Sequence, residues 1–152
     1  MAVLVIAEHD NQVLKTSTLN TITAAQKINN EIHLIILGKN IEALANTSKS
    51  IHALSKVLKC DNEKLENFLP EILAPIIAET ASAYSHVLAP ASTFGKNLLP
   101  RISALLDTTQ VSDIIGIENE NTFIRPIYAG NAIAHVQTNQ EINLLTIRPS
   151  SF

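Results

Sequence analysis

The stretch that decides the fold is "SHVLAPASTFGKNLLPRISALL", residues 85–106. Residues 85–90 form an apolar run, which predicts a strand buried on both faces of a sheet. Behind them, leucine and isoleucine recur at helical spacing, which predicts an amphipathic helix. Because proline is best tolerated in the first turn of a helix, Pro100 indicates that this helix begins near Gly95 to Asn97. The stretch is therefore predicted to be one strand–helix unit.

The same alternation of strand and helix recurs along the preceding part of the chain. Buried parallel sheets with helical crossovers have this pattern, so the fold class is α/β, with a mostly parallel sheet flanked by helices. Ser17 or Thr18 is the expected N-cap of the first helix, and Pro70 suits the first turn of the third. The expected strands are 2–7, 31–37 and 55–60, and the expected helices are 17–29, 40–51 and 67–83.

The alternation of predicted strands and helices ends after Ser112. Strand-like segments then follow one another with only short polar connections between them, and Gly130–Asn131 is the clearest turn. This pattern predicts a C-terminal antiparallel β extension to the parallel sheet. No internal repeat or linker composition interrupts the chain, so residues 1–152 are expected to form a single domain. The expected strand segments of the extension are 112–118, 121–130, 132–138 and 142–148.

Composition and charge exclude several classes of protein. Apolar residues make up 46% of the chain and the net charge is −3, which is typical of a globular protein without a basic surface for nucleic acid or an anionic membrane. Cys60 is the sole cysteine, so no disulfide joins two parts of the chain. No apolar run approaches the length of about 20 residues that a membrane span needs. We therefore expect a soluble protein of a reducing intracellular compartment.

Gly95 and Lys96 lie where a predicted strand ends and a predicted helix begins, a place where many proteins bind phosphate. A phosphate-binding P-loop needs a second glycine and a Ser or Thr after the lysine, but Asn97 stands there. With four glycines in the whole chain, no glycine-rich phosphate loop can be assembled. The favoured interpretation is that Gly95 lets the chain turn.

Histidines offer a second set of candidates. His9 and Asp10 follow the first strand, at the edge where open α/β sheets bind ligands. An adjacent histidine and aspartate could act as a general acid and base. Residues at such a position more commonly lie in a solvated turn. The five histidines are too scattered, and cysteine too rare, for a zinc pattern. His33 and His135 fall in strands, where half-exposed positions are expected. No metal site is predicted.

Arg101, Asp113 and Arg125 are charged residues embedded in otherwise apolar segments. Long charged side chains are rarely buried without a partner, so an internal ion pair or a surface arginine explains them. A contact of each guanidinium with a partner protein explains them equally well. The sequence leaves these two interpretations open.

Several separate segments, in the right order, resemble the N-terminal domain of the electron transfer flavoprotein alpha subunit. The resemblance runs from the first strand to "IRPSSF" (147–152) and so covers essentially the whole chain. The segments are "VLVIAEHDN" (3–11), "TLNTITAA" (18–25), "FGKNLLPRISALL" (94–106), "SDIIGI" (112–117) and "FIRPIYAGNA" (123–132).

The resemblance implies an adenine-nucleotide-hydrolase-like, Rossmann-like fold and a role as an electron carrier rather than an enzyme. It implies a heterodimer with a beta subunit that takes electrons from acyl-CoA dehydrogenases, as in fatty acid β-oxidation, and passes them to a membrane-bound quinone oxidoreductase. FAD belongs to a second domain that is expected beyond Phe152, and AMP to the beta subunit, so no cofactor is expected here. The location would be the bacterial cytoplasm or the mitochondrial matrix.

Within this resemblance, the chain is expected to be a scaffold that pairs with the beta subunit and supports the flavin domain. The segment from Thr93 to Arg101 and the turn 128–131 are candidate contact surfaces. The alternatives are a free-standing adenine-nucleotide-binding module using the crevice at strands one and four, and a hydrolase with His9 and a nucleophile at Ser92 or Thr93. The candidate interface residues are Gly95, Lys96, Arg101, Arg125, Tyr128 and Asn131.

Overall fold

The computed structural model describes residues 1–152. Four helices and nine strands follow one another along the chain, with short 3₁₀ turns at Glu63–Leu65, Tyr128–Gly130 and Pro149–Ser151. The helices are α1 (Thr16–Gln26), α2 (Glu42–Ser48), α3 (Pro70–Ala81) and α4 (Thr93–Leu105). The strands are β1 (Val3–Ile6), β2 (Ile32–Gly38), β3 (Lys56–Asp61), β4 (His86–Pro90), β5 (Gln110–Ile114), β6 (Gly116–Asn119), β7 (Thr122–Ile127), β8 (Ala132–Gln137) and β9 (Asn143–Ile147).

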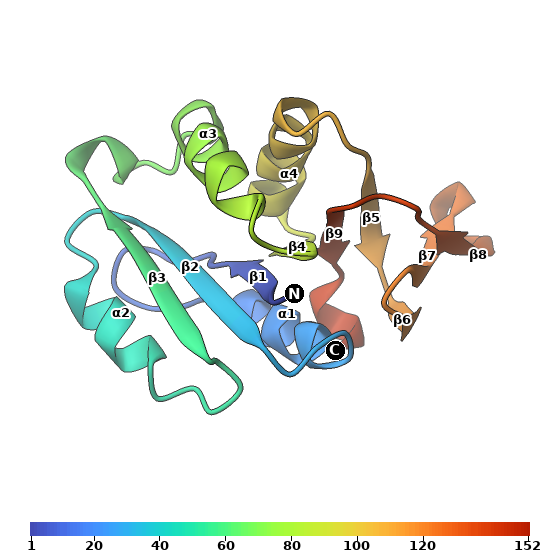
Figure 1. Ribbon diagram of the computed structural model, residues 1–152, viewed down its shortest axis with the longest axis horizontal. Helices are drawn as coiled ribbons and strands as arrows, with labels where there is room; N and C mark the ends of the chain where they lie inside the picture. The colour runs from blue at the N-terminus through green and yellow to red at the C-terminus, as the bar shows by residue number, and fades with distance from the viewer.

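The main sheet has six parallel strands in the order β3-β2-β1-β4-β9-β5. Helices α3 and α4 cover one face of it, and α1 and α2 cover the other (Figure 1). Each face has its own apolar core, and every residue of β1 and β4 is buried between the two. Parallel strands enclosed in this way need continuous apolar runs, which is the pattern that predicted them. The α/β fold class is confirmed.

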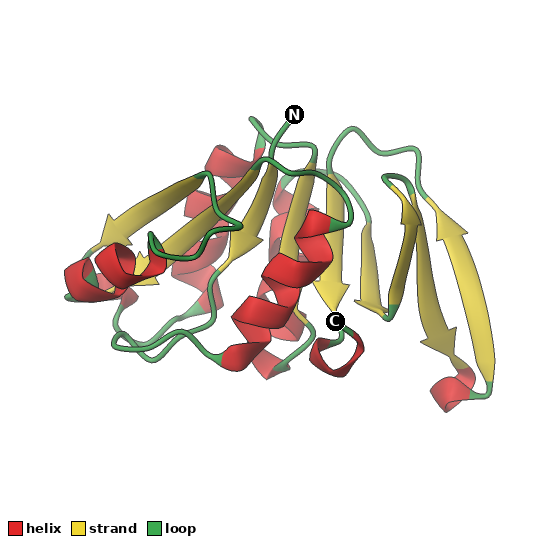
Figure 2. Cartoon of the chain, turned by 90° about the horizontal axis from the view of Figure 1, so that it is seen from below, coloured by secondary structure: helices red, strands yellow, loops and turns green.

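The antiparallel extension is confirmed for β6, β7 and β8, which form a separate three-stranded sheet in that order. Figure 2 shows this sheet beside the β5 edge of the main sheet. The prediction is wrong for β5 and β9. Strand β9 inserts between β4 and β5 and runs parallel to both. All residues of β9 are buried, as in β1, so its apolar pattern suits the enclosed sheet, and the short connection before it carries the chain from one sheet to the other.

None of the four helices begins at the predicted residue, and α4 and α1 also differ from the prediction in their caps or in the place of a proline. Helix α4 begins at Thr93, because Ser92 caps it by accepting a hydrogen bond from the Gly95 amide at 3.4 Å. Pro100 consequently lies inside the helix, on its exposed side, where water can reach the carbonyl left without an amide partner. Helix α1 follows Lys15, which provides no side-chain cap, so the expected caps at residues 17 and 18 are wrong. Pro70 stands in the first turn of α3, as expected.

A buried histidine anchors the antiparallel sheet to the main one. His86, at the start of β4, donates from Nε2 to the carbonyl oxygen of Glu120 in the turn between β6 and β7 (2.7 Å). Its ring meets the fully buried Phe123 edge-on, with ring centroids 6.3 Å apart. Burial lowers the pKa of His86 below the ordinary value of 6.5, so the ring is neutral at neutral pH.

Candidate functional site

The largest crevice lies at the carboxyl ends of β1 and β4. Helix α1 leaves β1 over one face of the sheet, and α4 leaves β4 over the other. Open α/β sheets bind their ligands where the connections diverge in this way, so the crevice occupies the fold's usual site. Its volume is about 400 Å³. The lining residues are Glu8, His9, Lys15, Asn67, Phe68, Leu69, Pro70, Thr93, Phe94 and Asn97.

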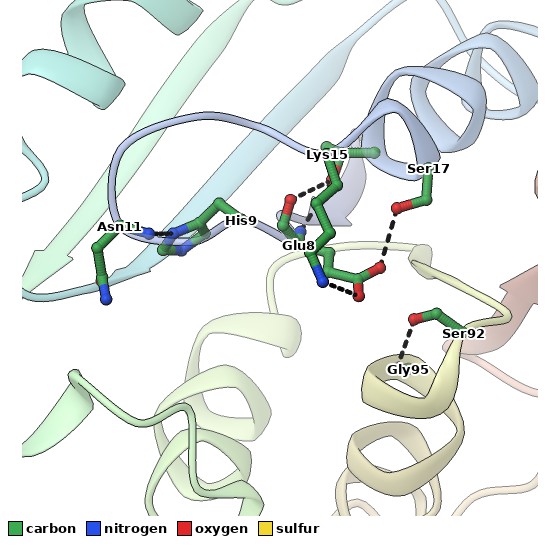
Figure 3. Close-up of polar contacts among 8 residues, drawn as sticks. Glu8, His9, Asn11, Lys15, Ser17, Ser92 and Gly95 are labelled. Carbon is green, nitrogen blue, oxygen red and sulfur yellow. Dashed lines mark hydrogen bonds and ion pairs between the residues drawn. The ribbon is translucent and has the colours of Figure 1, made fainter.

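The carboxylate of Glu8 accepts hydrogen bonds from side chains at the N-terminus of α1 (Figure 3). Its side chain is buried; Oε1 accepts from Lys15 Nζ at 3.0 Å and Oε2 from Ser17 Oγ at 2.9 Å. The hydroxyl of Thr18 holds the Glu8 backbone on both sides, accepting from its amide and donating to its carbonyl at 2.9 Å each. A helix N-terminus with a nearby lysine is a natural anion site. Here the protein's own carboxylate already satisfies it.

His9 is buried, so the expected solvated turn is wrong for this residue. Its Nδ1 accepts from the Asn11 amide and its Nε2 lies at hydrogen-bond distance from the Leu37 carbonyl, both at 3.0 Å, which fixes the neutral tautomer protonated at Nε2. Burial lowers the pKa of His9 below 6.5, and the ring meets Phe68 edge-on. The Asp10 carboxylate instead accepts from two amides of its own loop. With both ring nitrogens engaged, His9 has no nitrogen free to serve as a base for Thr93.

Gly95 has a different role from the predicted one. It lies in the first turn of α4 and is buried there, so it does not turn the chain. A Cβ at this position would stand 1.9 Å from the backbone oxygen of Pro90. Glycine therefore allows α4 to pack directly against the end of β4, beside the crevice. Lys96 follows it on the exposed side of the helix.

A second polar site lies farther along the same edge of the main sheet, at the ends of β5 and β9. Asp113 sits at a break in the β5–β9 register with a φ of 60°, and such a bulge re-aims a side chain. Its carboxylate accepts two hydrogen bonds from Arg148, from Nε at 3.1 Å and from Nη2 at 2.5 Å. This pairing lowers the pKa of Asp113, and the charges of Lys96 and Arg125 lower it further.

Apart from Gly95, the predicted interface residues fall into three groups in the structure. The charges of Lys96 on α4 and Arg125 on β7 contribute to the lowered pKa of Asp113, but neither residue forms an ion pair with it. Tyr128 and Asn131 lie in and after the turn that follows β7, and Tyr128 is 80% exposed. Arg101 stands apart, because it pairs across the helices with Glu71 of α3 at 2.6 Å.

For Arg101 and Asp113 the internal ion pair is therefore present. Arg125 instead donates from Nη2 to Ser112 Oγ at 3.2 Å, and its buried Nε has no partner.

Sequence reasoning missed Glu8 and Arg148. Glu8 had a signal, since a carboxylate after an enclosed strand stands beside the helix that follows, with Lys15 and Ser17 near that helix's start. Arg148 had a weaker one, because its pairing with Asp113 depends on β9 lying next to β5. No three His, Cys, Asp or Glu side chains are grouped so as to hold a metal ion. No helix is long and apolar enough to cross a membrane.

The sheet order and the crevice at the ends of β1 and β4 define an open, Rossmann-like α/β protein in which Glu8 engages the lysine and the serine at the start of α1. Residues 3–152 match the electron transfer flavoprotein domain. The chain therefore belongs to the electron transfer flavoprotein family.

Similar proteins carry the name of one subunit. The chain is 50% identical over 152 residues to electron transfer flavoprotein subunit alpha of Pseudomonas aeruginosa, covering 100% of this chain and 49% of the relative. It is 42% identical over 157 residues to the mitochondrial alpha subunit of Dictyostelium discoideum, covering 98% and 44%. The chain thus spans about half the length of the curated relatives it matches. The predicted correspondence to the N-terminal domain of the alpha subunit is confirmed.

Proposed function

We propose that this chain is the scaffold domain of an electron transfer flavoprotein alpha subunit, and that residues 1–152 form that single domain. It pairs with a beta subunit and supports an FAD-binding half, and the assembly carries electrons from acyl-CoA and related dehydrogenases to a quinone oxidoreductase. The observation that carries this proposal is the similarity to named alpha subunits over 100% of this chain but 49% of the relative.

In this proposal the chain is an electron-carrier component and not an enzyme. The crevice supports that role, because Lys15 and Ser17 are engaged by Glu8 and both nitrogens of His9 by backbone groups. FAD is held by the other half of the alpha subunit and AMP by the beta subunit. The compartment is the cytoplasm in a bacterium or the mitochondrial matrix in a eukaryote, as relatives of both kinds suggest.

The test is reconstitution of the assembly. The chain is co-expressed with the beta subunit and with the FAD-binding half as a separate polypeptide. We expect one complex on size exclusion, with flavin absorbance that is retained through gel filtration. The matched sample without this chain should lose flavin or fall apart. Equal flavin retention in the two samples would exclude a scaffold role.

A free-standing adenine-nucleotide-binding module is the second candidate, and the crevice of about 400 Å³ at the usual site favours it. A ligand at about 100 times its dissociation constant adds roughly 2.7 kcal/mol of stability. We expect no thermal shift of this chain with AMP, ATP or FAD, because Glu8 occupies the anion position. A clear shift with AMP or ATP would put the nucleotide module first.

A further inference from the structure

The five residues that follow β9 run from the middle of the main sheet to helix α1, and we call them the 148–152 strap. Figure 1 shows the short 3₁₀ turn of this strap, at the red end of the chain, beside α1. Strand β9 lies inside the sheet, between β4 and β5, and both faces of the sheet are open to a chain that leaves its end. The connection after β1 goes to α1 on one face, and the connection after β4 goes to α4 on the other. The strap takes the α1 side.

The first residue of the strap is held by strand β5. Arg148 donates its backbone amide to the Ile114 carbonyl at 3.0 Å. Its guanidinium donates to the two carboxylate oxygens of Asp113, from Nε at 3.1 Å and from Nη2 at 2.5 Å. A two-pronged arginine–carboxylate pair fixes direction as well as distance, so the chain leaves β9 in one defined orientation.

The middle of the strap is a tight turn. The Ser151 amide donates to the Arg148 carbonyl at 3.1 Å, and the Phe152 amide donates to the Pro149 carbonyl at 3.4 Å. Proline at the start of this turn has a fixed φ, which reduces the conformational freedom of the segment. The strap is therefore a stiff connection between its two ends.

The last residue of the strap is held by helix α1 through three different contacts. The half-buried ring of Phe152 packs against the apolar core that lies between this helix and the sheet. Asn20 Nδ2 donates to the backbone oxygen of Phe152 at 2.6 Å, and Lys27 Nζ lies 5.0 Å from the centre of the ring, within the range of a cation–π contact. Asn20 and Lys27 are seven residues apart, so they lie on the same side of the helix.

We propose that the 148–152 strap fixes the place from which the FAD-binding half is tethered, on the α1 side of the main sheet. Phe152 is the anchor, and Asn20 and Lys27 are its positioning residues. This inference rests on the proposed function, in which the FAD-binding half follows in the same polypeptide. Release of residues 149–152 would move the start of the tether back to the end of β9. The tether would gain at most about 13 Å of reach, since an extended residue spans about 3.3 Å, and could then pass over either face of the sheet.

Hydrogen exchange of the full-length alpha subunit, in complex with the beta subunit, tests the anchor. The double variant Asn20→Ala with Lys27→Gln removes the hydrogen bond and the cation but keeps good helix formers in and after α1. We expect the amides of Ser151 and Phe152 to exchange about tenfold faster, as the loss of one hydrogen bond and one cation–π contact implies. Gln26→Ala is the matched control, because Gln26 is exposed on the same helix and makes no hydrogen bond to the strap. It should leave this exchange unchanged.

Photochemical cross-linking of the same complex tests where the tether starts. The photoreactive residue p-benzoylphenylalanine is placed either at Thr23, which is exposed on α1, or at Ala104, which is exposed on α4. We expect adducts with the residues that follow Phe152 to form preferentially from position 23. Phe152→Ala should abolish this preference, and Phe152→Tyr, which keeps the ring, should retain it. A purely structural contact of Phe152 with the core would leave the preference unchanged in both variants.

The outcomes separate the two proposals. Exchange that stays at the wild-type rate in the double variant overturns the anchor. Equal cross-linking from positions 23 and 104 in the wild type, or a preference that survives Phe152→Ala, overturns the tether but keeps the scaffold function. If the wild-type subunit neither retains FAD nor pairs with the beta subunit, the proposed function fails and the inference fails with it.

Discussion

The crevice between β1 and β4 and the Asp113–Arg148 site lie along the same edge of one sheet, yet they use their charged groups differently. In the crevice, Glu8 satisfies Lys15 and Ser17, and backbone groups satisfy His9. At the second site, Arg148 alone pairs with the Asp113 carboxylate, and the buried Nε of the neighbouring Arg125 has no partner. The crevice keeps a volume of about 400 Å³, but the donors at the start of α1 are engaged internally, whereas a buried donor is left without a partner where the two sheets meet.

The crevice and the turn between β7 and β8 also differ in how their geometry is fixed. At the crevice, α4 packs so tightly on β4 that only glycine fits at position 95. At the far end of the antiparallel sheet, Gly130 has open space around it but a φ of 91°. One glycine is needed for lack of room and the other for its backbone conformation, so the same substitution should act by different mechanisms in the two places.

The largest effect is expected from Gly95→Ala. A Cβ 1.9 Å from the Pro90 oxygen forces the first turn of α4 away from β4, and overpacking of this kind against backbone costs about 3 kcal/mol of unfolding free energy. Urea denaturation followed by circular dichroism measures it. Gly130→Ala is the comparison variant and should cost about 1 kcal/mol, from backbone strain alone. Equal costs at the two positions would contradict the close packing of α4 on β4.

A smaller effect is expected from pH, through His9 in the crevice and His86 at the junction of the sheets. Burial lowers the pKa of both below 6.5 in the folded chain, so the unfolded chain binds protons first as the pH falls. Stability is therefore complete above pH 6.5 and is lost below it, by at most about 1.4 kcal/mol per pH unit for each histidine. Asp113, whose pKa is lowered from 3.8 by Arg148, adds its loss only in stronger acid.

Urea titrations between about pH 7.5 and pH 5 test this. Replacing His86 by glutamine should remove one histidine's share of the slope, and the same change at His9 should remove the other. Hydrogen exchange localises the loss: the His86 variant should expose amides of β6–β8, because the bond to Glu120 is gone, and the His9 variant should spare them. A slope that survives both substitutions would assign the titration to other groups.

The parallel part of the fold could be predicted from the sequence because enclosed strands need continuous apolar runs and each is followed by a helix. The place of β9 could not, since its pattern fits any enclosed position and the short polar connection before it is equally compatible with a hairpin. The predicted start of α4 is wrong because it was placed from Pro100 alone, whereas the side chain of Ser92 caps the helix earlier in the chain. Local sequence patterns predict which segments form helices and strands well, and which strands pair with one another poorly.

For the candidate sites, too, the position could be predicted from the sequence but the contacts could not. The crevice was located correctly at strands one and four, because ligand position follows from topology. That His9 would be buried, and that Glu8 would fill the anion position, depends on contacts across the loop that spacing does not encode. Arg101 and Arg125 looked alike in sequence, as charges within apolar segments, and only the tertiary structure separates them.

The smallest expected effect on stability is that of replacing Arg101. Arg101 pairs with Glu71 on the exposed surface of α3 and α4, and exposed ion pairs of this kind contribute about 0.5 kcal/mol or less. Arg101→Ala should therefore leave both the urea midpoint and the affinity for the beta subunit near the wild-type values. Arg125→Gln should change the urea midpoint more, because it removes the hydrogen bond from the guanidinium to Ser112 at the junction of the two sheets. If Arg101→Ala lowered the urea midpoint as much as Arg125→Gln, the exposed pair between α3 and α4 would stabilise the fold more than its exposure allows, and the contrast between the two arginines would be lost.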